Sequence, residues 1–339
     1  MTCKKTAPYC LAICVLLSFP FLAIGHSYHT IFHQLQTQIK AKTNAEALKS
    51  NTDCSKKVKY CKGTRTFKDG SFYDGEFQFG KPHGKGVKSW LDGSKYTGEF
   101  KKGFRHGHGE QLLDDGGYYE GEWEHGFMHG KGTYTFACGH TYVGEFFEDR
   151  MSGNGIITLM NGEIYEGEWN EDKANGEGTY QLIDGTKHFG KYREGKRHGK
   201  GVITWISGDV LSGNWKNGLA HRKSIFQFSN GDQLKCNWEE GEINGKLVYT
   251  RSNGQKMEGT LKNIEEQMST DEALLEDANG NIALVWYAGA LEHKINRNYE
   301  QALSLMKQAK TYLPPSSDLN RLIYQQMKVI ETEMIERGL

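Results

Sequence analysis

The stretch that decides the fold is Tyr119-Glu-Gly-Glu-Trp123-Glu-His-Gly126-Phe-Met-His129-Gly130-Lys-Gly132-Thr-Tyr134-Thr-Phe136-Ala-Cys-Gly139-His-Thr141. The same 23-residue pattern begins again, with no insertion or deletion between copies, at Tyr73, Tyr96, Tyr142, Tyr165, His188, Leu211 and Leu234. Residues 73–256 are therefore eight tandem repeats, numbered here one to eight, and a half copy at residues 62–72 precedes them. Self-similarity at a fixed period predicts an array in which each unit packs on its neighbours.

Each repeat has the composition of a β-hairpin. Its first and fifth positions are mostly aromatic and its third is mostly glycine, and these three positions share one face of a strand because side chains alternate. The bare glycine leaves a notch, where we expect a ring from a neighbouring hairpin to lie.

Two further glycine positions predict turns. The twelfth position is glycine in seven repeats, and we expect it to join the two strands of the hairpin. A histidine precedes this position in five repeats, at His83, His106, His129, His198 and His221. The twenty-first position is glycine in all eight repeats and predicts the turn to the next repeat.

The pattern Tyr-x-Gly-Glu-Trp/Phe-x-x-Gly-x-x-His-Gly-x-Gly, with a later Asp-Gly, resembles the MORN (membrane occupation and recognition nexus) repeat. The resemblance implies a mainly β protein, with an elongated single-layer antiparallel β-hairpin solenoid over residues 62–261. It also implies a membrane-associated scaffold or a partner-binding surface. MORN arrays occur beside lipid kinase and SET methyltransferase domains, but the roughly 80 residues after the repeats leave no room for either. Repeats seven and eight depart from the pattern at Arg222, Ser224, Cys236 and Leu247.

The N-terminus is typical of a targeting segment. Lys4 and Lys5 precede an apolar run over residues 11–24. Residues 1–25 are expected to form a hydrophobic helix, either a signal peptide cleaved before His26 or an uncleaved anchor. Both interpretations place residues 26–339 on the non-cytosolic side of a membrane. Residues 26–61 are a polar stalk or spacer, and an amphipathic stripe there leaves self-association open.

Four cysteines follow the targeting segment. Cys54 and Cys61 either close a small loop in an oxidising compartment or remain free thiols. Cys138 and Cys236 fall within the repeats and are interpreted as structural. No Cys-x-x-Cys pair is present, so zinc binding has little support.

The C-terminal part differs from the repeats. Residues 262–280 form an acidic linker, and residues 281–339 are predicted to be helical. Trp286, Tyr299, Ala302, Ala309 and Pro314 resemble one tetratricopeptide unit. We expect this small α-helical segment to cap the open end of the array, and a partner-binding module is the alternative.

The sequence offers little for catalysis, and we predict no enzyme, cofactor or metal. Gly199-Lys-Gly201 resembles a phosphate loop, but no Ser or Thr follows the lysine and no helix is predicted there. Equivalent histidines should lie about 10 Å apart, too far to share a zinc ion. The glutamates at the fourth position suit a solvated, ion-paired face.

The hairpin-turn edge is locally basic, although the whole chain balances 42 basic against 42 acidic residues. The sequence therefore predicts a non-catalytic, membrane-tethered or exported scaffold that presents the repeats to a protein partner, with no nucleic acid involved. The alternative is peripheral binding of anionic lipids through the basic edge. The residues predicted to contact lipid or partner are Lys81, Lys85, Lys101, Lys102, Arg105, Lys196, Arg197 and Lys200.

Overall fold

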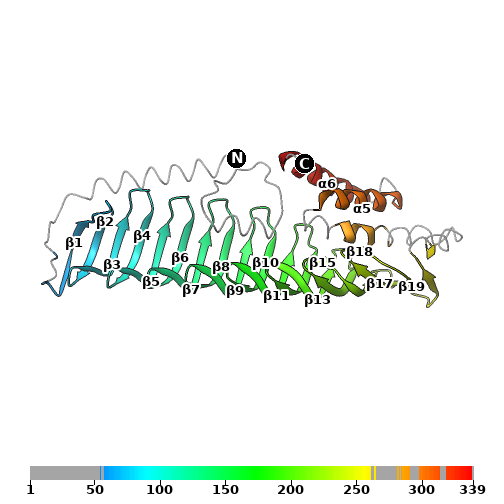
Figure 1. Ribbon diagram of the computed structural model, residues 1–339, viewed down its shortest axis with the longest axis horizontal. Coiled ribbons are helices and arrows are strands. Elements are labelled where there is room, and N and C mark those ends of the chain that lie inside the picture. Colours follow the sequence, from blue (N-terminus) through cyan, green and yellow to red (C-terminus); the bar gives the residue numbers. More distant parts are fainter. Residues whose placement is uncertain are drawn as a thin grey trace. The chain divides into compact units, whose positions relative to one another are not determined.

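The computed structural model of the protein describes residues 54, 57–260, 263–264, 281, 283, 285–290, 298–313 and 318–337. The predicted targeting segment (1–25), the stalk up to residue 53 and most of the acidic linker lie outside the described residues. The chain divides into two compact units, with the boundary between Gly153 and Asn154. The predicted mainly β architecture is confirmed, because twenty strands are assigned to one antiparallel sheet whose members pair in chain order (Figure 1).

The first unit contains a series of antiparallel hairpins. Its strands alternate in length because each repeat contributes a short first strand and a longer second one. The strands are β1 (Tyr60–Thr66), β2 (Phe72–Gln78), β3 (Lys81–Ser89), β4 (Lys95–Lys101), β5 (Phe104–Leu112), β6 (Tyr118–Glu124), β7 (Phe127–Thr135), β8 (Thr141–Phe147) and the start of β9 (Arg150–Thr158).

The second unit continues the hairpins and adds helices. Its strands are the rest of β9, β10 (Ile164–Asn170), β11 (Lys173–Gln181), β12 (Lys187–Arg193), β13 (Lys196–Thr204), β14 (Val210–Lys216), β15 (Leu219–Ala220), β16 (Arg222–Gln227), β17 (Gln233–Glu239), β18 (Glu242–Ile243), β19 (Leu247–Thr250) and β20 (Lys256–Gly259). Its helices are α5 (Tyr299–Thr311) and α6 (Asp318–Arg337), and residues 285–290 are also helical.

The turn within each hairpin lies earlier than the sequence predicts. The seventh and eighth positions both have positive φ, as in Phe79 (49°) and Gly80 (72°), and they connect β2 to β3. Two successive positive φ values are the mark of a type I′ turn. The expected turn at the twelfth position is therefore wrong, because Gly84 lies inside β3, where the pairing with β2 slips at a bulge. The predicted turn at the twenty-first position is confirmed at Gly93, whose N–H donates to the Trp90 carbonyl.

A row of tyrosines forms the interior face of the first five repeats. Tyr73, Tyr96, Tyr119 and Tyr142 are fully buried. The ring of Tyr96 packs edge-on against Phe100 of its own repeat and Trp123 of the next, with ring centroids 5.0 and 5.2 Å apart. Such edge-to-face pairs add to the free energy gained from burial alone.

The tyrosine also occupies the notch above the glycines, and this corrects the expectation of a neighbour's ring. A Cβ atom on Gly86 would stand 2.3 Å from the Tyr73 hydroxyl oxygen, which belongs to the same repeat. The hydroxyl donates a hydrogen bond to the Glu76 carbonyl at 2.8 Å. Each tyrosine thus fills the notch and makes its hydroxyl hydrogen bond within its own repeat. The fifth-position ring of the next repeat packs against it and connects the two repeats.

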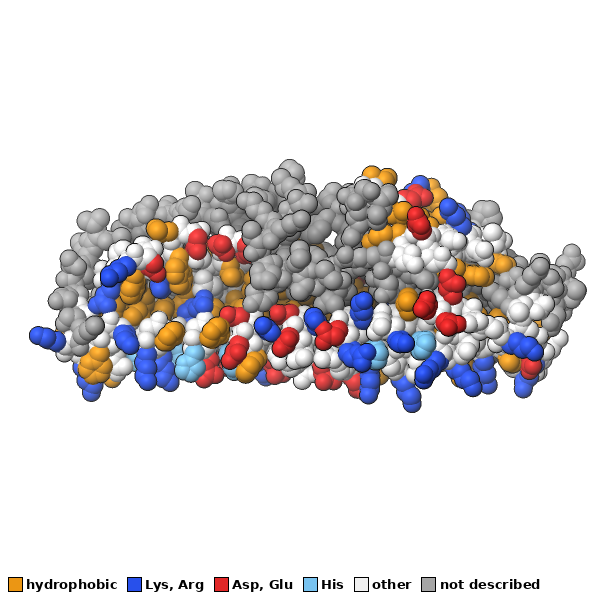
Figure 2. Space-filling view, viewed as in Figure 1, with side chains coloured by type: hydrophobic (Ala, Val, Ile, Leu, Met, Phe, Trp, Pro, Cys, Tyr) orange, Lys and Arg blue, Asp and Glu red, His pale blue; other side chains and the backbone are white. Residues whose placement is uncertain are grey.

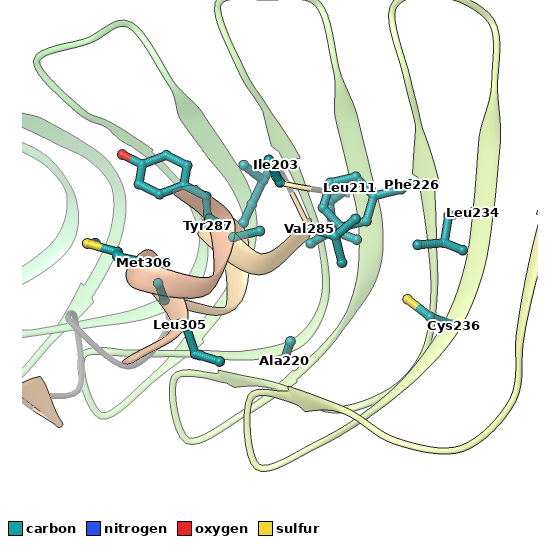
Figure 3. Packing of buried hydrophobic residues seen from close by; sticks show 14 of the residues in the cluster. Ile203, Leu211, Ala220, Phe226, Leu234, Cys236, Val285, Tyr287, Leu305 and Met306 are labelled. Carbon is teal, nitrogen blue, oxygen red and sulfur yellow. The ribbon is translucent and has the colours of Figure 1, made fainter. Parts of the chain in front are cut away.

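The interior face changes in repeats six to eight. The first position becomes His188, then Leu211 and Leu234, so this position loses the tyrosine ring and its hydroxyl, while the fifth position stays aromatic. Leu211, Phe226 and Leu234 are buried, together with side chains of the helical segment. Figure 3 shows Val285 beside Leu211 and Phe226, and Leu305 extending toward Ala220. Tyr287 and Met306 belong to the same buried cluster. The helical segment covers the apolar face of the last strands by side-chain packing, which refines the expectation of a cap at the open edge.

Candidate interaction surfaces

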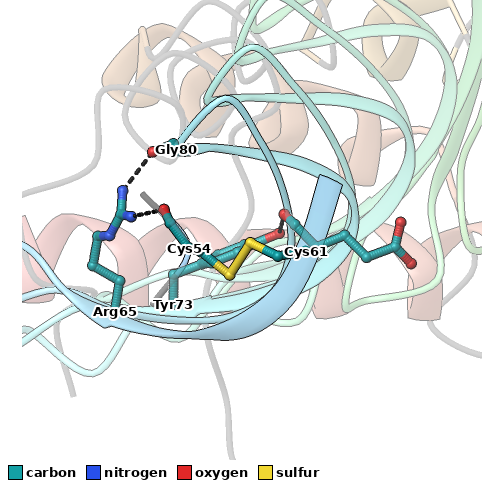
Figure 4. The surroundings of a disulfide bond; sticks show 6 residues. Cys54, Cys61, Arg65, Tyr73 and Gly80 are labelled. Carbon is teal, nitrogen blue, oxygen red and sulfur yellow. Dashed lines mark hydrogen bonds between the residues drawn. A yellow bond between two sulfur atoms is a disulfide. The ribbon is translucent and has the colours of Figure 1, made fainter. Parts of the chain in front are cut away.

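The described chain begins at a disulfide. Cys54 and Cys61 are joined, with an S–S distance of 2.02 Å, and Cys61 lies in the edge strand β1 (Figure 4). The Arg65 guanidinium donates to the carbonyls of Cys54 and Gly80, so it ties the disulfide loop to the first hairpin turn. The other cysteines of the described chain, Cys138 and Cys236, are buried thiols. Burial raises the pKa of the Cys236 thiol to about 11, so it is not a reactive thiolate.

Six of the eight predicted contact residues are exposed lysines on the strands and turns of the repeats. Figure 2 shows basic side chains along the lower margin of the view, with acidic ones between them. The exposed six are Lys81, Lys85, Lys101, Lys102, Lys196 and Lys200.

The two arginines of that set do not belong to the exposed edge. Arg197 is 7% exposed and donates to the Gly218 carbonyl at 3.1 Å. Arg105 lies over the Trp123 ring, 4.2 Å from its centroid, and donates to the Gln111 side chain and the Gly126 carbonyl. Burial lowers the pKa of the Arg105 guanidinium. Both occupy the tenth position of their repeats, which faces inward and is also filled by Met128 and Ala174.

Exposed phenylalanines accompany the lysines in the first unit. Phe79, Phe104 and Phe127 lie at or beside the hairpin turns and are 52%, 57% and 45% exposed. The neighbouring lysines are Lys81, Lys101 and Lys102. Sequence analysis did not select these phenylalanines, because they alternate between the seventh and ninth positions and form no constant column.

A second apolar row lies on the opposite turns of the second unit. Met160, Ile183 and Ile206 all occupy the nineteenth position and are 50%, 67% and 82% exposed. Each stands directly before the first polar residue of its connecting turn, which is Asn161, Asp184 or Ser207. The position is polar in repeats seven and eight, where Ser229 and Ser252 occupy it.

The fourth-position glutamates have a specific role that the sequence did not predict. Glu122 Oε1 accepts the backbone N–H of Lys131 at 3.2 Å, and Glu168 Oε1 accepts that of Glu177 at 2.8 Å. Each of these N–H groups follows the twelfth-position glycine at the bulge. The carboxylates therefore bind backbone donors of the bulge, in addition to facing solvent.

Repeat six lacks this glutamate. Its fourth position is Lys191, and the adjoining strands form a shallow groove of about 520 Å³. The groove lies on the outer face, opposite the buried first and fifth positions. It is lined by Glu177, Phe189, Lys191, Lys200, Val202, Ser212, Asn214, Lys223 and Ile225, with backbone from the glycines between them. The change from glutamate to lysine at this position is the sequence signal that would have located it.

The repeated histidines lie within the second strands, immediately before the bulge. His83 Nδ1 accepts the Lys102 N–H at 3.5 Å, so this ring spans two repeats. Within the described part of the chain, no three His, Cys, Asp or Glu side chains gather closely enough to hold a metal ion. None of the helices that the structure describes is long and apolar enough to cross a membrane, and the predicted segment 1–25 is not among them.

Comparison with known proteins identifies the repeat. A family model described as "MORN repeat" matches seven consecutive segments, at residues 73–95, 96–118, 119–141, 142–164, 165–187, 188–210 and 212–233. Repeat eight is not matched, although β17 to β19 continue the strand pattern there. A search of curated proteins found no match.

Solved structures share only a weak likeness with the chain. The Drosophila melanogaster SAS-4 (dCPAP) TCP domain, in complex with a proline-rich motif of Ana2 (dSTIL), is 12% identical, with a TM-score of 0.24 over 63% of this chain and 96% of that one. Virginiamycin B lyase from Staphylococcus aureus is also 12% identical, with a TM-score of 0.14 over 58% of this chain and 68% of that one. TM-scores this low carry no argument about fold or function. The tandem family matches, together with hairpins in the same register, show that the chain is a MORN-repeat protein.

Proposed function

We propose that this protein is a non-catalytic scaffold that presents its repeat surface to a protein partner. MORN repeats are protein- or membrane-binding modules, and MORN-repeat proteins are typically non-catalytic. The observation that carries the choice of a protein partner is the row of Met160, Ile183 and Ile206, because exposed apolar side chains in line suit an extended apolar contact.

Site-specific photo-cross-linking tests this proposal. A photoreactive amino acid replaces Ile183 or Ile206, and in the matched control it replaces Ser229, the polar residue at the same position of repeat seven. We expect one discrete protein adduct from the two isoleucine sites and none from Ser229. Adducts that are equally abundant from all three sites would contradict a partner surface at this row.

We further propose that the protein is exported or membrane-anchored through residues 1–25. The Cys54–Cys61 disulfide supports this location, because disulfides persist in oxidising compartments and are rare in the cytosol. Cell fractionation with N-terminal sequencing tests it. A mature chain that starts at His26 is released, whereas a chain that keeps Met1 in the membrane fraction is anchored. If Cys54 and Cys61 were free, alkylatable thiols in a cytosolic fraction, both export and membrane anchoring would be refuted.

Binding of anionic membrane lipids is the second candidate function. It is favoured by Phe79 and Phe104 standing exposed among Lys81, Lys101 and Lys102, because aromatic rings and lysines together suit the membrane interface. Flotation with neutral vesicles and with vesicles containing phosphatidylserine tests this function. Lys101→Glu with Lys102→Glu should abolish binding to the anionic vesicles. Equal binding to neutral and anionic vesicles would exclude recognition of anionic lipids. Arg105 and Arg197 are unsuitable targets because both support the fold.

A further inference from the structure

The bulge of repeats one to five contains a carboxylate. A Cβ atom on the twelfth-position glycine would stand 2.1 Å from Glu76 Oε2 at Gly84 and 2.5 Å from Glu99 Oε2 at Gly107. The same closeness recurs at Gly130, Gly153 and Gly176, where the oxygen belongs to Glu122, Glu145 and Glu168. In three of these repeats the carboxylate accepts the next backbone N–H. The bulge is thus a carboxylate-binding backbone feature that the chain itself occupies five times.

Among the residues that the structure describes, none supplies a carboxylate to this place in repeat six. The residue nearest to Gly199 is Lys191, whose Cβ and Cδ carbons lie 3.8 Å from where a Cβ on Gly199 would stand. The φ of Gly199 is 71°, within the 57° to 75° range of its counterparts in repeats one to five, so the bulge keeps its backbone conformation. Repeat six therefore presents the same backbone feature with a lysine in place of the glutamate.

The surrounding charge suits an anion. Lys191, Lys200 and Lys223 line the groove, against one acidic residue, Glu177. The three lysines are exposed on the outer face of β12, β13 and β16. His198, beside Gly199, has a pKa lowered by burial and by the positive charges of Arg193 and Lys216.

An apolar row runs beside these lysines. Phe189 pairs with Val202, Val202 with Ser212, and Ser212 with Ile225, so their side chains stand next to one another on four adjacent strands. Phe189 is 54% exposed and Ile225 is 40% exposed. Cross-strand neighbours on one face lie about 5 Å apart, so Phe189 and Val202 adjoin, and the small side chain of Ser212 separates them from Ile225.

We infer that this groove binds an acidic peptide segment of a protein partner. An Asp or Glu carboxylate of the peptide takes the place that the repeat's own glutamate holds in repeats one to five, next to Lys191 and Lys200. An apolar side chain of the same segment packs on Phe189, Val202 and Ile225. A carboxylate is chosen over other anions because this chain itself places a carboxylate at the equivalent bulges. The inference rests on the proposed scaffold function and adds the chemistry of the partner.

A phage-displayed library of random peptides, selected on the full-length protein, tests the inference. Selection on the native protein should enrich peptides that combine Asp or Glu with large apolar residues. Binding of an enriched peptide is then measured by fluorescence anisotropy. If the enriched peptides have no excess of acidic residues, or if no peptide is enriched, the inference is overturned. Either result leaves the cross-linking test at Ile183 and Ile206 to decide the scaffold function separately.

Lys191→Glu is the decisive variant, because it supplies the missing carboxylate and fills the site from within. We expect it to weaken binding of the enriched peptide about tenfold or more, with no loss of thermal stability. Lys187→Glu is the matched control: it makes the same charge change on the same strand, but Lys187 does not line the groove. Equal weakening by both variants would indicate general charge attraction and would overturn the site.

Discussion

The Cα atom of Gly109 lies 2.5 Å from the place where a Cβ atom on Gly98 would stand. The two glycines are directly paired across β4 and β5, and the hydroxyl oxygen of Tyr96 is 2.6 Å from the same place. The buried tyrosine and the close glycine pair are therefore one feature. The ring can lie flat over the strands only because neither strand has a side chain beneath it.

Gly98→Ala should therefore be strongly destabilising. The added methyl group meets backbone on one side and a buried ring on the other, and overpacking of this kind costs about 3 kcal/mol. Gly93→Ala is the control, because no atom lies within 4 Å of its Cβ and only the positive φ of 95° opposes alanine. That strain costs about 1 kcal/mol. Urea unfolding compares the two variants, and equal losses would refute the steric argument.

Arg222→Gly should stabilise the protein. Arg222 holds the twelfth position of repeat seven with a φ of 64°, where all the other repeats have glycine. This left-handed conformation costs a residue with a Cβ atom roughly 1 kcal/mol of folding free energy. Glycine should therefore raise the free energy of unfolding by about that amount. Arg222→Ala keeps the Cβ atom and should give no such gain. If alanine stabilises as much as glycine, the gain comes from removing the arginine charge instead.

Asp149→Asn should stabilise the protein at neutral pH. Burial raises the pKa of the Asp149 carboxyl, although the Met128 N–H donates to it at 2.7 Å and the charge of Arg105 opposes the shift. The contribution of a group with a raised folded-state pKa is fully present below its unfolded-state pKa and is lost as pH rises through the folded-state pKa. Asparagine keeps an acceptor for the Met128 N–H and stays neutral. The stability difference should grow with pH and then level off in thermal unfolding followed from pH 3 to pH 7.

Asp92→Asn is the control, because the pKa of Asp92 shifts in the opposite direction and the expected change in stability has the opposite sign. The pKa of Asp92 is lowered, chiefly because the Ser94 hydroxyl donates to the carboxylate, and the Ser94 N–H donates to it at 2.8 Å. Asp92 therefore stabilises the fold above its unfolded-state pKa and loses this effect as pH falls. Asparagine at this position should be the less stable form at neutral pH. If both substitutions changed stability in the same direction, the electrostatic argument for Asp149 would fail.

The 23-residue period predicts more features of this structure than any single motif does. It predicts the strands, the connecting turn at Gly93 and the inward face of Tyr73, because all three follow from residue types that repeat with few exceptions. It misplaces the hairpin turn, because pairs such as Phe79-Gly80 and His125-Gly126 vary at their first residue and lack the usual Asn-Gly signal. The bulge near Gly84 then shifts the alternation of the second strand.

The shift of side-chain alternation at the bulge also explains why Arg105 and Arg197 were wrongly predicted to lie on the exposed edge. A simple alternation gave no reason to place the tenth position inside, yet Arg197 is buried there. The column of Pro82, Met128, Met151 and Ala174 at the same position indicates an inward face. Charge alone selected Arg105 and Arg197 as surface residues. Sequence reasoning also missed the groove of repeat six, whose signal is the replacement of the fourth-position glutamate by Lys191.

Phe226 is the residue through which the cap can be tested. It is fully buried and stacks between Trp205 and Phe228, with ring centroids 5.4 and 5.5 Å away. It also belongs to the buried cluster that includes Val285 and Met306 of the helical segment.

Phe226→Ala should cost about 3–5 kcal/mol and should loosen the helical segment first. The helices gain their stability from packing on this apolar face, so a cavity beneath them lowers the free energy of local opening. Hydrogen exchange should therefore accelerate in residues 285–290 and in α5. Trp169→Ala is the control: it truncates a buried aromatic residue of the same unit that lies outside the cluster. Exchange in the helices that responds equally to both variants would mean that the cap depends on the sheet as a whole, not on the face formed where leucine replaces tyrosine.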